Sequence, residues 1–588
     1  MNFRSRLCPV RLGLLVCVMA LAHLVLLWRL ADLQVVRAGD LRERAQRQHQ
    51  RHVRLDPIRG PILDRNGSEL ALSLDVYSVY ADPSDVGASG PTARALARVL
   101  QVNEAELREK LDSPRYFVWV KRKISDADKA RVEALRLPGV GFLRESRRFY
   151  PKGALAAHVL GHVGLDNEGQ AGLEFALDSE IRGEAGLALT LKNGLGQGFD
   201  TRVEREPTGG ATVTLTIDEV LQHMVERELV RGLKESGGRW GSAVVLDPAS
   251  GAILALANVP SYDPNTPRRF RAEAWRNRAV GDAYEPGSTF KMFTAAAALE
   301  EGMARSEEWI HCGNGSLRVA NRMVRDHKSF GALTLAQVLE QSSNVGIMKV
   351  GLRLPPRRLF EAVEVFGFGE RTGVELPGES GGILRPTAQW SGLTQAMMSM
   401  GQEVSVTPLQ LAAATAAIAN GGVLRRPFIV GKVVGRDGRT VRQTAPDPGR
   451  QVISADVAAT LRRMLEGVVL RGTGRGAAVP GYRVAGKTGT AQKIDASGRY
   501  SARDFVASFV GWAPAQDPAI LALVVIDSPR GLYHGGEVAA PVFSRIALPA
   551  LQYLRVAPDT PAGGAARAAL VAMANPGRGA GETRSRLR

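Results

Sequence analysis

The sequence of 588 residues predicts an α/β (α+β) protein of more than one domain, with one membrane-spanning helix near the N-terminus. Two observations predict this architecture. Strand-like segments lie at both ends of a long C-terminal region and helical patterns lie between them, which implies one sheet built from distant segments and covered by helices. A mixed region of strands and helices precedes it and carries no evident chemistry of its own.

The N-terminal segment predicts a membrane anchor over residues 12–30. An apolar run extends from Leu12 to Trp28, and arginines precede it at three positions: Arg4, Arg6 and Arg11. They predict that residues 1–11 form a cytoplasmic tail and that the anchor lies in the inner (cytoplasmic) membrane. The chain after the anchor is then expected to be extracytoplasmic, in the periplasm. A cleaved signal peptide is the alternative, because Ala20-Leu21-Ala22 resembles a cleavage site. The apolar run, however, continues past that point.

The region after the anchor divides into a linker and a first folded domain. Residues 31–54 predict a charged, helix-prone juxtamembrane linker, and residues 55–225 predict a separate mixed domain. Within this domain we expect a turn at Asn66-Gly67, a strand from Glu69 to Val79 and two helical stretches between Ala93 and Ala134. A strand over residues 212–217 then leads into a helix that Asp218 caps.

Residues 226–557 predict a second domain. A hairpin with strands over 241–246 and 252–257 opens it, and helices dominate from about 289 to 419. We expect three later strands and a closing helix, over 482–485, 505–511, 520–526 and 541–553. The tail over 558–588 is rich in Ala, Gly and Arg and predicts a disordered basic segment.

Composition narrows the possible partners. The formal net charge of +17 and the pI of about 10.1 suit an anionic surface such as a membrane or a cell wall, or nucleic acid. No zinc-finger spacing or aromatic-basic RNA-binding signature is present, so we expect no nucleic acid. Three cysteines, at positions 8, 17 and 312, predict neither a disulfide framework nor a metal site, and the nine histidines show no ligand spacing.

Ser288-Thr289-Phe290-Lys291 is the first of three segments that predict one active site. Ser288 opens a predicted helix, whose first N–H groups favour developing negative charge. Lys291 follows three residues later and therefore lies on the same face. A serine hydroxyl needs a base before it attacks, and lysine serves as one only when neutral, as burial or a second cation makes it. For such a pair alone, a solvated helix face would be the simpler explanation.

Ser342-Ser343-Asn344 is the second segment, and it follows a predicted helical stretch. Such polar residues ordinarily cap a helix or form a turn. In an acyl-transfer site, Ser342 would relay a proton to the leaving amine. The amide of Asn344 would hold both a substrate amide and the lysine.

Lys487-Thr488-Gly489-Thr490 is the third segment. As a strand it places Lys487 and Gly489 on one face and both threonines on the other. Gly489 permits close approach of another backbone. Lys487 supplies positive charge, and the hydroxyl of Thr488 or Thr490 would bind a substrate carboxylate. The N–H groups of Ser288 and Thr490 would form an oxyanion hole.

The third segment also fits a nucleotide-binding pattern. Residues 481–488 match the P-loop, G-x-x-x-x-G-K-[ST]. The intervening Tyr-Arg-Val-Ala is bulky and strand-like, no helical period follows, and ATP is not supplied outside the cytoplasm. These points favour the acyl-transfer interpretation.

Together and in this order the three segments resemble those of penicillin-binding proteins. Further segments are similar to motifs of the class B family, namely residues 59–67, 148–151, 172–174, 407–410 and 535–543. Ser343-Asn344-Val345-Gly346 is most similar to the septal, cell-division branch. The resemblance implies a penicillin-binding transpeptidase domain with a mainly antiparallel sheet, and an N-terminal pedestal or dimerisation-like domain.

The resemblance also implies an activity, a peptidoglycan D,D-transpeptidase that forms an acyl-ester on Ser288. Lys291 would be the general base, while Ser342, Asn344 and Lys487 would handle protons and orientation. Stem peptides would be substrates and β-lactams would acylate the same serine, with no metal or cofactor. A septal glycosyltransferase and other division proteins would be partners of the pedestal.

Three other functions stay open at the level of sequence. A hydrolase with the same site, either a carboxypeptidase or a β-lactamase, is one, and an elongation-type transpeptidase is another. A penicillin sensor or an inactive membrane scaffold is the third. The short segment before the anchor opposes a sensor, and three intact motifs oppose an inactive scaffold.

Overall fold

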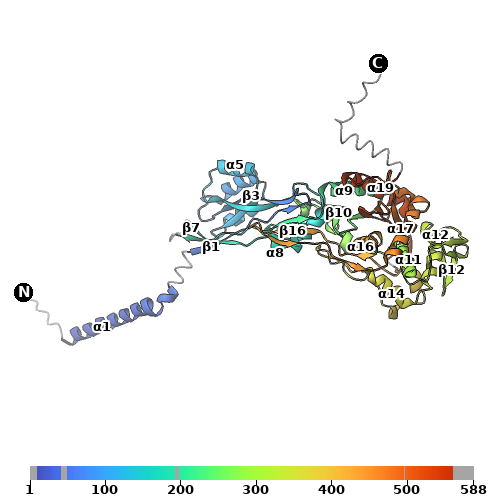
Figure 1. Ribbon diagram of the computed structural model, residues 1–588. Helices are drawn as coiled ribbons and strands as arrows, with labels where there is room; N and C mark the ends of the chain where they lie inside the picture. Colours follow the sequence, from blue (N-terminus) through green and yellow to red (C-terminus); the bar gives the residue numbers. More distant parts are fainter. Residues whose placement is uncertain (1–8, 42–49, 193–197, 496, 561–588) are drawn as a thin grey trace, which may run out of the picture. The chain divides into compact units, whose positions relative to one another are not determined.

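The computed structural model describes residues 9–41, 50–192, 198–495 and 497–560 (Figure 1). Most of the predicted cytoplasmic tail and residues 561–588 of the predicted basic tail lie outside these ranges. By its contacts the chain forms two compact units. One comprises residues 1–58 and 183–209, and the other comprises residues 59–182 and 210–588.

The first unit contains the apolar helix and a small sheet. Helix α1 (Pro9–Ala31) continues as a π-helical turn to Val36, and Val10–Val36 is long and apolar enough to cross a membrane. Strand β1 (Gln50–Leu55) pairs antiparallel with β6 (Gly186–Lys192), which pairs with β7 (Gly198–Arg205). The sequence predicts a helix-prone linker up to residue 54, and this prediction is wrong for residues 50–54, which form a strand. The partner β6 is remote in sequence, so local periodicity does not reveal the strand.

The second unit contains a seven-stranded sheet with the order β17-β16-β8-β2-β3-β4, and β5 pairs with β3. Its strands are β2 (Ile62–Leu63), β3 (Glu69–Ala81), β4 (Val118–Ile124), β5 (Val140–Phe149), β8 (Thr212–Leu215), β16 (Val430–Val434) and β17 (Thr440–Gln443). Residues 430–443 thus extend a sheet whose other strands come from the N-terminal half. The predicted boundary at 225/226 falls inside helix α9 (Glu219–Ser236).

Three helices pack on strands β3 and β4: α3 (Ser89–Leu100), α4 (Glu104–Leu111) and α5 (Asp126–Ala134). The two helical stretches predicted here are confirmed in part: α3 and α4 occupy the first, and α5 ends the second, but the second begins with strand β4. Its alternating Val118 and Val120 point into the core that these helices form. The predicted turn at Asn66-Gly67 is confirmed, and the carboxylate of Asp64 accepts the N–H groups of Asn66 and Ser68.

The larger domain is built on a five-stranded antiparallel sheet with the order β10-β9-β21-β20-β19. Its strands are β9 (Trp240–Leu246), β10 (Ile253–Val259), β19 (Ala485–Ile494), β20 (Tyr500–Ala513) and β21 (Ile520–Asp527). The prediction of one sheet from distant segments is confirmed. Every residue of β21 is buried, because helices cover both faces.

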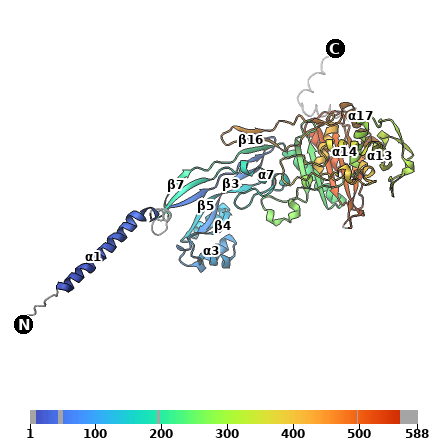
Figure 2. The same cartoon turned by 90° about the horizontal axis from the view of Figure 1, so that it is seen from below.

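Two helices pack on one face of this sheet, α9 and α19 (Ala540–Tyr553). Asp218 caps α9 as predicted, since its carboxylate accepts the N–H groups of Val220 and Leu221. The other face of the sheet packs against the helical part of the domain. In this part, α13 and α14 lie far from α3 and β4 (Figure 2). This part comprises α10 (Arg278–Gly281), α11 (Lys291–Glu300), α12 (Leu335–Glu340), α13 (Asn344–Gly351), α14 (Pro356–Val365), α15 (Thr394–Ser399), α16 (Pro408–Ala419) and α17 (Ala455–Leu470).

The second unit also contains short helices and strands. The short helices are α6 (Ala157–Leu160), α7 (Gly172–Ala176), α8 (Asp178–Ile181) and α18 (Gly535–Val538). The short strands are β11 (Trp309–His311), β12 (Ser316–Val319), β13 (Arg322–Arg325), β14 (Ala332–Thr334), β15 (Val423–Leu424) and β18 (Arg450–Gln451). Strands β12 and β13 form a hairpin whose end leads toward the site described below.

Two predicted boundaries need correction. Residues 482–484 precede the strand rather than forming it, because β19 begins at Ala485. The predicted tail does not begin at residue 558, since the carboxylate of Asp559 accepts the backbone N–H of Arg483 at 2.7 Å. The chain near Asp559 is therefore held against the segment before β19.

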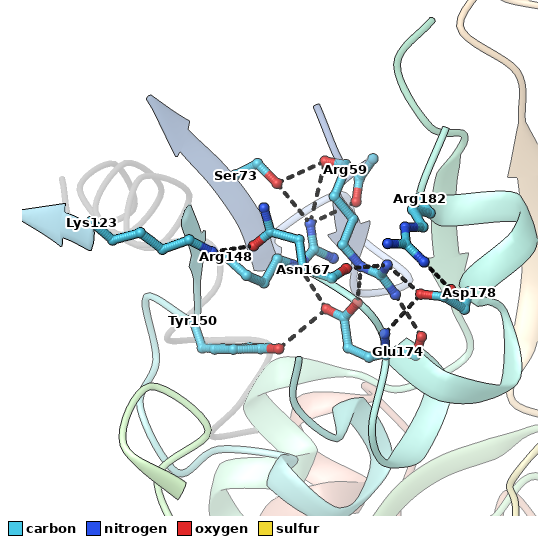
Figure 3. A network of polar contacts seen from close by, with 11 residues as sticks. Arg59, Ser73, Lys123, Arg148, Tyr150, Asn167, Glu174, Asp178 and Arg182 are labelled. Carbon is cyan, nitrogen blue, oxygen red and sulfur yellow. Dashed lines mark hydrogen bonds and ion pairs between the residues drawn. The ribbon is translucent and has the colours of Figure 1, made fainter. Parts of the chain in front are cut away.

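The N-terminal segments that resemble family motifs meet at one buried carboxylate (Figure 3). Glu174 accepts hydrogen bonds from Arg59 and, at 2.6 Å, from Arg148, and all three side chains are buried. Arg148 also donates to the carbonyl of Gly60 at 2.7 Å, and Arg59 pairs with Asp178. A buried carboxylate between two guanidinium groups compensates charges that would otherwise be costly to bury. The network therefore ties residues 59–60, 148 and 174–178 together.

Candidate active site

Ser288 lies in a tight turn immediately before helix α11. A 3-10 turn (Gly287–Phe290) precedes α11, which begins at Lys291. The predicted helix start is thus confirmed, with a tighter first turn than an α-helix. Gly287 has φ +54°, and a Cβ atom there would approach the carbonyl oxygen of Thr490 to 3.1 Å. The turn consequently packs closely on strand β19.

All three predicted segments contribute to one cavity of about 240 Å³. Ser288, Asn344 and Thr490 line it together. Its other walls come from the β12–β13 hairpin, from the end of α15 and from β19: Arg322, Met323, Val324, Arg325, Met397, Met400, Gln402, Ala491 and Gln492. Segments about fifty and two hundred residues after Ser288 therefore meet beside it, as the motif set predicts.

Lys291 is fully buried and points to the second segment. Its Nζ atom donates to the backbone oxygen of Ser342 at 2.6 Å, to the hydroxyl of Ser342 at 3.3 Å and to Oδ1 of Asn344 at 2.7 Å. Three acceptors fix the amine in place, so the solvated helix face is wrong for this lysine. The predicted contact between Asn344 and the lysine is confirmed.

Lys487 is also fully buried, and it reaches the same hydroxyl from β19. Its Nζ atom lies 3.0 Å from Oγ of Ser342 and donates to the carbonyl of Thr488 at 3.2 Å. The two lysines therefore share one serine hydroxyl. A hydroxyl with two amine neighbours is placed to pass a proton between them and a third group.

Burial lowers the pKa values of both lysines. The pKa of Lys291 falls to about 7 because burial disfavours the ammonium form, while the carboxylate of Asp326 acts in the opposite direction. Burial and the nearby charge of Lys291 together hold the pKa of Lys487 well below its ordinary value. Because each charge disfavours the other, the pair holds fewer than two protons near neutral pH.

Asp326 supports the second segment, and no sequence motif predicts this role. Its carboxylate accepts the hydroxyl of Ser343 at 2.8 Å and the backbone N–H groups of Asn344 and Val345. Ser343 caps α13 through Gly346, which lies 2.9 Å away. The end of the β12–β13 hairpin thereby fixes the start of α13. Asp326 and Ser343 are too far apart in the sequence for a local motif to link them. Only a prediction of the β12–β13 hairpin could have indicated this hydrogen bond.

Gly489 permits the close contact that the sequence predicts. A Cβ atom there would lie 2.9 Å from a methyl of Thr289 and 3.1 Å from the carbonyl oxygen of Pro286. On the other side, a Cβ atom on Gly535 would lie 2.3 Å from the carbonyl oxygen of Gly489. Backbone segments thus approach β19 closely from two sides, one of them the Ser288 turn.

The two threonines of the third segment differ in position. The structure does not place Thr488 against the cavity, because its hydroxyl bonds that of Thr473 at 2.8 Å and the residue is buried. Thr490 lines the cavity, although its hydroxyl accepts the N–H of Gly535 at 3.0 Å. A substrate carboxylate at this end would therefore meet Thr490 first, with Thr488 behind it.

The P-loop alternative is wrong. Lys487 and Thr488 lie within β19, which continues in pairing with β20 to Ile494. A phosphate-binding loop requires a turn followed by a helix at this point.

Comparison with protein families agrees with this site. Residues 241–548 match the penicillin-binding protein transpeptidase domain, and residues 54–215 match the penicillin-binding protein dimerisation domain. The chain therefore belongs to the penicillin-binding protein transpeptidase family, in the class B form that carries a dimerisation domain.

Relatives span nearly the whole chain. Stage V sporulation protein D of Bacillus subtilis is 36% identical over 92% of this chain and 85% of its own length. Peptidoglycan D,D-transpeptidase FtsI of Escherichia coli is 35% identical over 93% of this chain and 92% of its own length. The crystal structure of penicillin-binding protein 3 from Mycobacterium tuberculosis with aztreonam has 32% identity and a TM-score of 0.69, and covers 87% of this chain and 99% of that one.

Proposed function

We propose that the chain is a septal peptidoglycan D,D-transpeptidase whose acyl-ester forms on Ser288. One observation carries the assignment: two fully buried lysines, Lys291 and Lys487, share the hydroxyl of Ser342 beside a cavity that Ser288 lines. Relatives named as peptidoglycan D,D-transpeptidases support the substrate class. The same chemistry makes β-lactams inhibitors, since they present a reactive amide to the serine.

Acylation begins with proton removal from Ser288. Neutral Lys291 takes the hydroxyl proton as Oγ attacks the carbonyl carbon between the two terminal D-alanines of a donor stem peptide. The N–H groups of Ser288 and Thr490 stabilise the resulting oxyanion. The carbon–nitrogen bond then breaks, and Ser342 delivers a proton to the departing amine of D-alanine. An ester on Ser288 remains.

The remaining residues orient the donor and replace the proton on Ser342. Lys487 lies 3.0 Å from the Ser342 hydroxyl and returns a proton to it, while its charge attracts the donor carboxylate. Thr488, Gly489 and Thr490 are the substrate-binding strand, and Asn344 holds the donor amide. An amine of a second stem peptide then attacks the ester carbon, and the bond from that carbon to Oγ of Ser288 breaks. Lys291 returns its proton to Oγ, and the proton lost by the amine passes through Ser342 to Lys487, so a cross-link forms and the site is restored.

Location and partners belong to the same proposal. Helix α1 has the length and apolar composition of a single-pass anchor in the cytoplasmic membrane. The arginines before it favour a periplasmic catalytic domain. The pedestal is the region that matches the dimerisation domain, residues 54–215, and the catalytic domain is the region that matches the transpeptidase domain, residues 241–548. The pedestal is the surface for a septal glycosyltransferase and other division proteins.

A product assay tests the activity. The full chain is incubated with a donor pentapeptide strand and an acceptor strand, and the products are separated by mass. Cross-linked dimers together with free D-alanine are expected with the wild type and neither with Ser288→Ala. Release of D-alanine without dimers would instead support a carboxypeptidase-type hydrolase.

A further inference from the structure

A second cavity, of about 450 Å³, lies away from the three motifs. Four segments of the second compact unit line it: the end of β4, the end of β5, the loop over residues 162–170 and the loop over residues 264–275. Its volume lies within the range of sites for small ligands. None of Ser288, Lys291 or Lys487 contributes to its wall.

The lining of this cavity is strongly basic. Arg147 comes from β5, Lys123 from β4, and Arg268 and Arg269 from the 3-10 turn at Pro267–Arg269. No aspartate or glutamate is among the described residues that line it. The fifth cation, Arg148, is neutralised by Glu174 behind the wall.

Three of these cations have no partner among the described residues. A neighbouring arginine on β4 is paired: Arg122 forms ion pairs with Glu145 and with Asp166, and its Nη1 atom lies 2.6 Å from Oδ1 of Asp166. The side chains of Arg147, Arg268 and Arg269 make no hydrogen bond or ion pair within the described ranges. Arg268 and Arg269 are exposed and Arg147 is half-buried, so solvent screens part of their charge. An anion in the cavity would supply the counter-charge that the described residues do not.

The wall is suited to hold such an anion with some precision. Arg148 and Tyr150 belong to the wall, and both reach the buried carboxylate of Glu174, which also pairs with buried Arg59 (Figure 3). Lys123 is positioned by a 2.8 Å hydrogen bond to Oδ1 of Asn167. The free guanidinium groups present planar donors that match carboxylate and phosphate oxygens in pairs.

Part of the lining is apolar. The ring of Trp275 lies in the wall, where its Nε1 atom donates to the carbonyl of Pro267 at 3.2 Å. Leu165 also lines the cavity and is half exposed. A ligand with a carbon framework as well as charged groups would use both parts of the surface.

We propose that this cavity is a binding site for a small ligand with two or more carboxylate or phosphate groups. The site is separate from the transpeptidase site and does not depend on its assignment. A recess of this size, rather than a flat face, favours a compact ligand over a membrane surface.

Titration calorimetry on the full chain in detergent micelles tests the proposal. The probes are pyrophosphate and citrate, which separate a phosphate source from a carboxylate source. We expect at least one to bind, with an affinity that falls as salt rises. The double variant Arg268→Gln/Arg269→Gln should weaken binding about tenfold or more, because charge-assisted hydrogen bonds are lost. Arg147→Gln should weaken it in the same direction and serves if the double variant does not fold.

Arg271→Gln is the matched control. Arg271 is exposed in the same loop and does not line the cavity, so this variant should bind the probe like the wild type. Penicillin labelling of each variant, expected to be unchanged, shows that the fold and the transpeptidase site are intact. Failure of both probes to bind the wild type would overturn the proposal. Equal weakening by Arg271→Gln would also overturn it, since that result means general surface attraction.

Discussion

The side chains of Lys291 and Lys487 meet at one hydroxyl, with their Nζ atoms 3.3 Å and 3.0 Å from Oγ of Ser342. Both amines are fully buried, and burial lowers the pKa of each. Because one charge disfavours the other, a neutral amine is available near neutral pH without a histidine. This arrangement is the basis of the proposal that a lysine activates Ser288.

The first prediction concerns the pH dependence of acylation. In the proposed mechanism the neutral form of Lys291 is the base. Burial lowers its pKa to about 7, so the acylation rate should rise with pH through that region and then level off. The Asp326 carboxylate favours the protonated amine. Asp326→Asn should therefore lower the pKa and move the rising limb to lower pH. The measurement is the rate constant for penicillin acylation between about pH 5 and about pH 9.

The control for this prediction is Asp437→Asn, an exposed carboxylate in the β16–β17 turn. Its pH profile should equal that of the wild type. A limb that stays in place or moves to higher pH in Asp326→Asn would contradict the role given to Lys291. A lower plateau alone would not, since Asp326 also positions Asn344.

The second prediction removes the shared hydroxyl. Ser342 has φ +58°, a left-handed conformation that glycine adopts without strain, so Ser342→Gly deletes the hydroxyl and leaves the backbone in place. Acylation by penicillin should slow about 100-fold or more, as expected for loss of a proton-transfer group. Thermal unfolding should change little. Wild-type acylation by this variant would show that Ser342 carries no proton.

The third prediction tests the close approach at Gly489. In Gly489→Ala the new methyl would lie 2.3 Å from Oγ of Ser508 on β20, 2.9 Å from a methyl of Thr289 and 3.1 Å from the Pro286 carbonyl oxygen. The Ser508 side chain and the Ser288 turn must therefore both move. Penicillin labelling should fall about tenfold or more, because a small displacement of the nucleophile is costly. Gly392→Ala is the control, since no atom lies within 4 Å of the added carbon. If both variants label alike, the contact does not position the turn.

The fourth prediction concerns the buried network of the pedestal. Glu174→Gln leaves Arg59 and Arg148 without their shared carboxylate and should lower the free energy of unfolding by about 3–5 kcal/mol. Asp166→Asn, at an exposed partner of Arg122, should cost about 1 kcal/mol or less. Denaturant titration of the full chain measures both. Equal losses would contradict the structural role of the network.

The sequence predicts the parts of this site that carry their own chemistry. The three motifs, the hairpin of β9 and β10, and the Asp218 cap all follow from local patterns, and the structure confirms their positions. Pairing between distant segments does not follow from such patterns. Strand β1 and the addition of β16 to the sheet of β8 depend on partners far away in the chain.

Asp326 and Thr488 illustrate the same limit within the site. Asp326 supports Ser343 from a hairpin whose register local sequence does not fix. Thr488 shares a strand face with Thr490, yet its hydroxyl is taken by Thr473, a residue outside every motif. Side-chain partners from unrelated segments decide both positions.

Mass spectrometry of the full chain after reaction with benzylpenicillin tests the central claim most directly. The wild type should gain one penicillin per chain, on the tryptic peptide that contains Ser288, and Ser288→Ala should gain none. Asn344 and Lys487 should remain unmodified in both. Equal labelling of Ser288→Ala, or an adduct on a different peptide, would contradict the account.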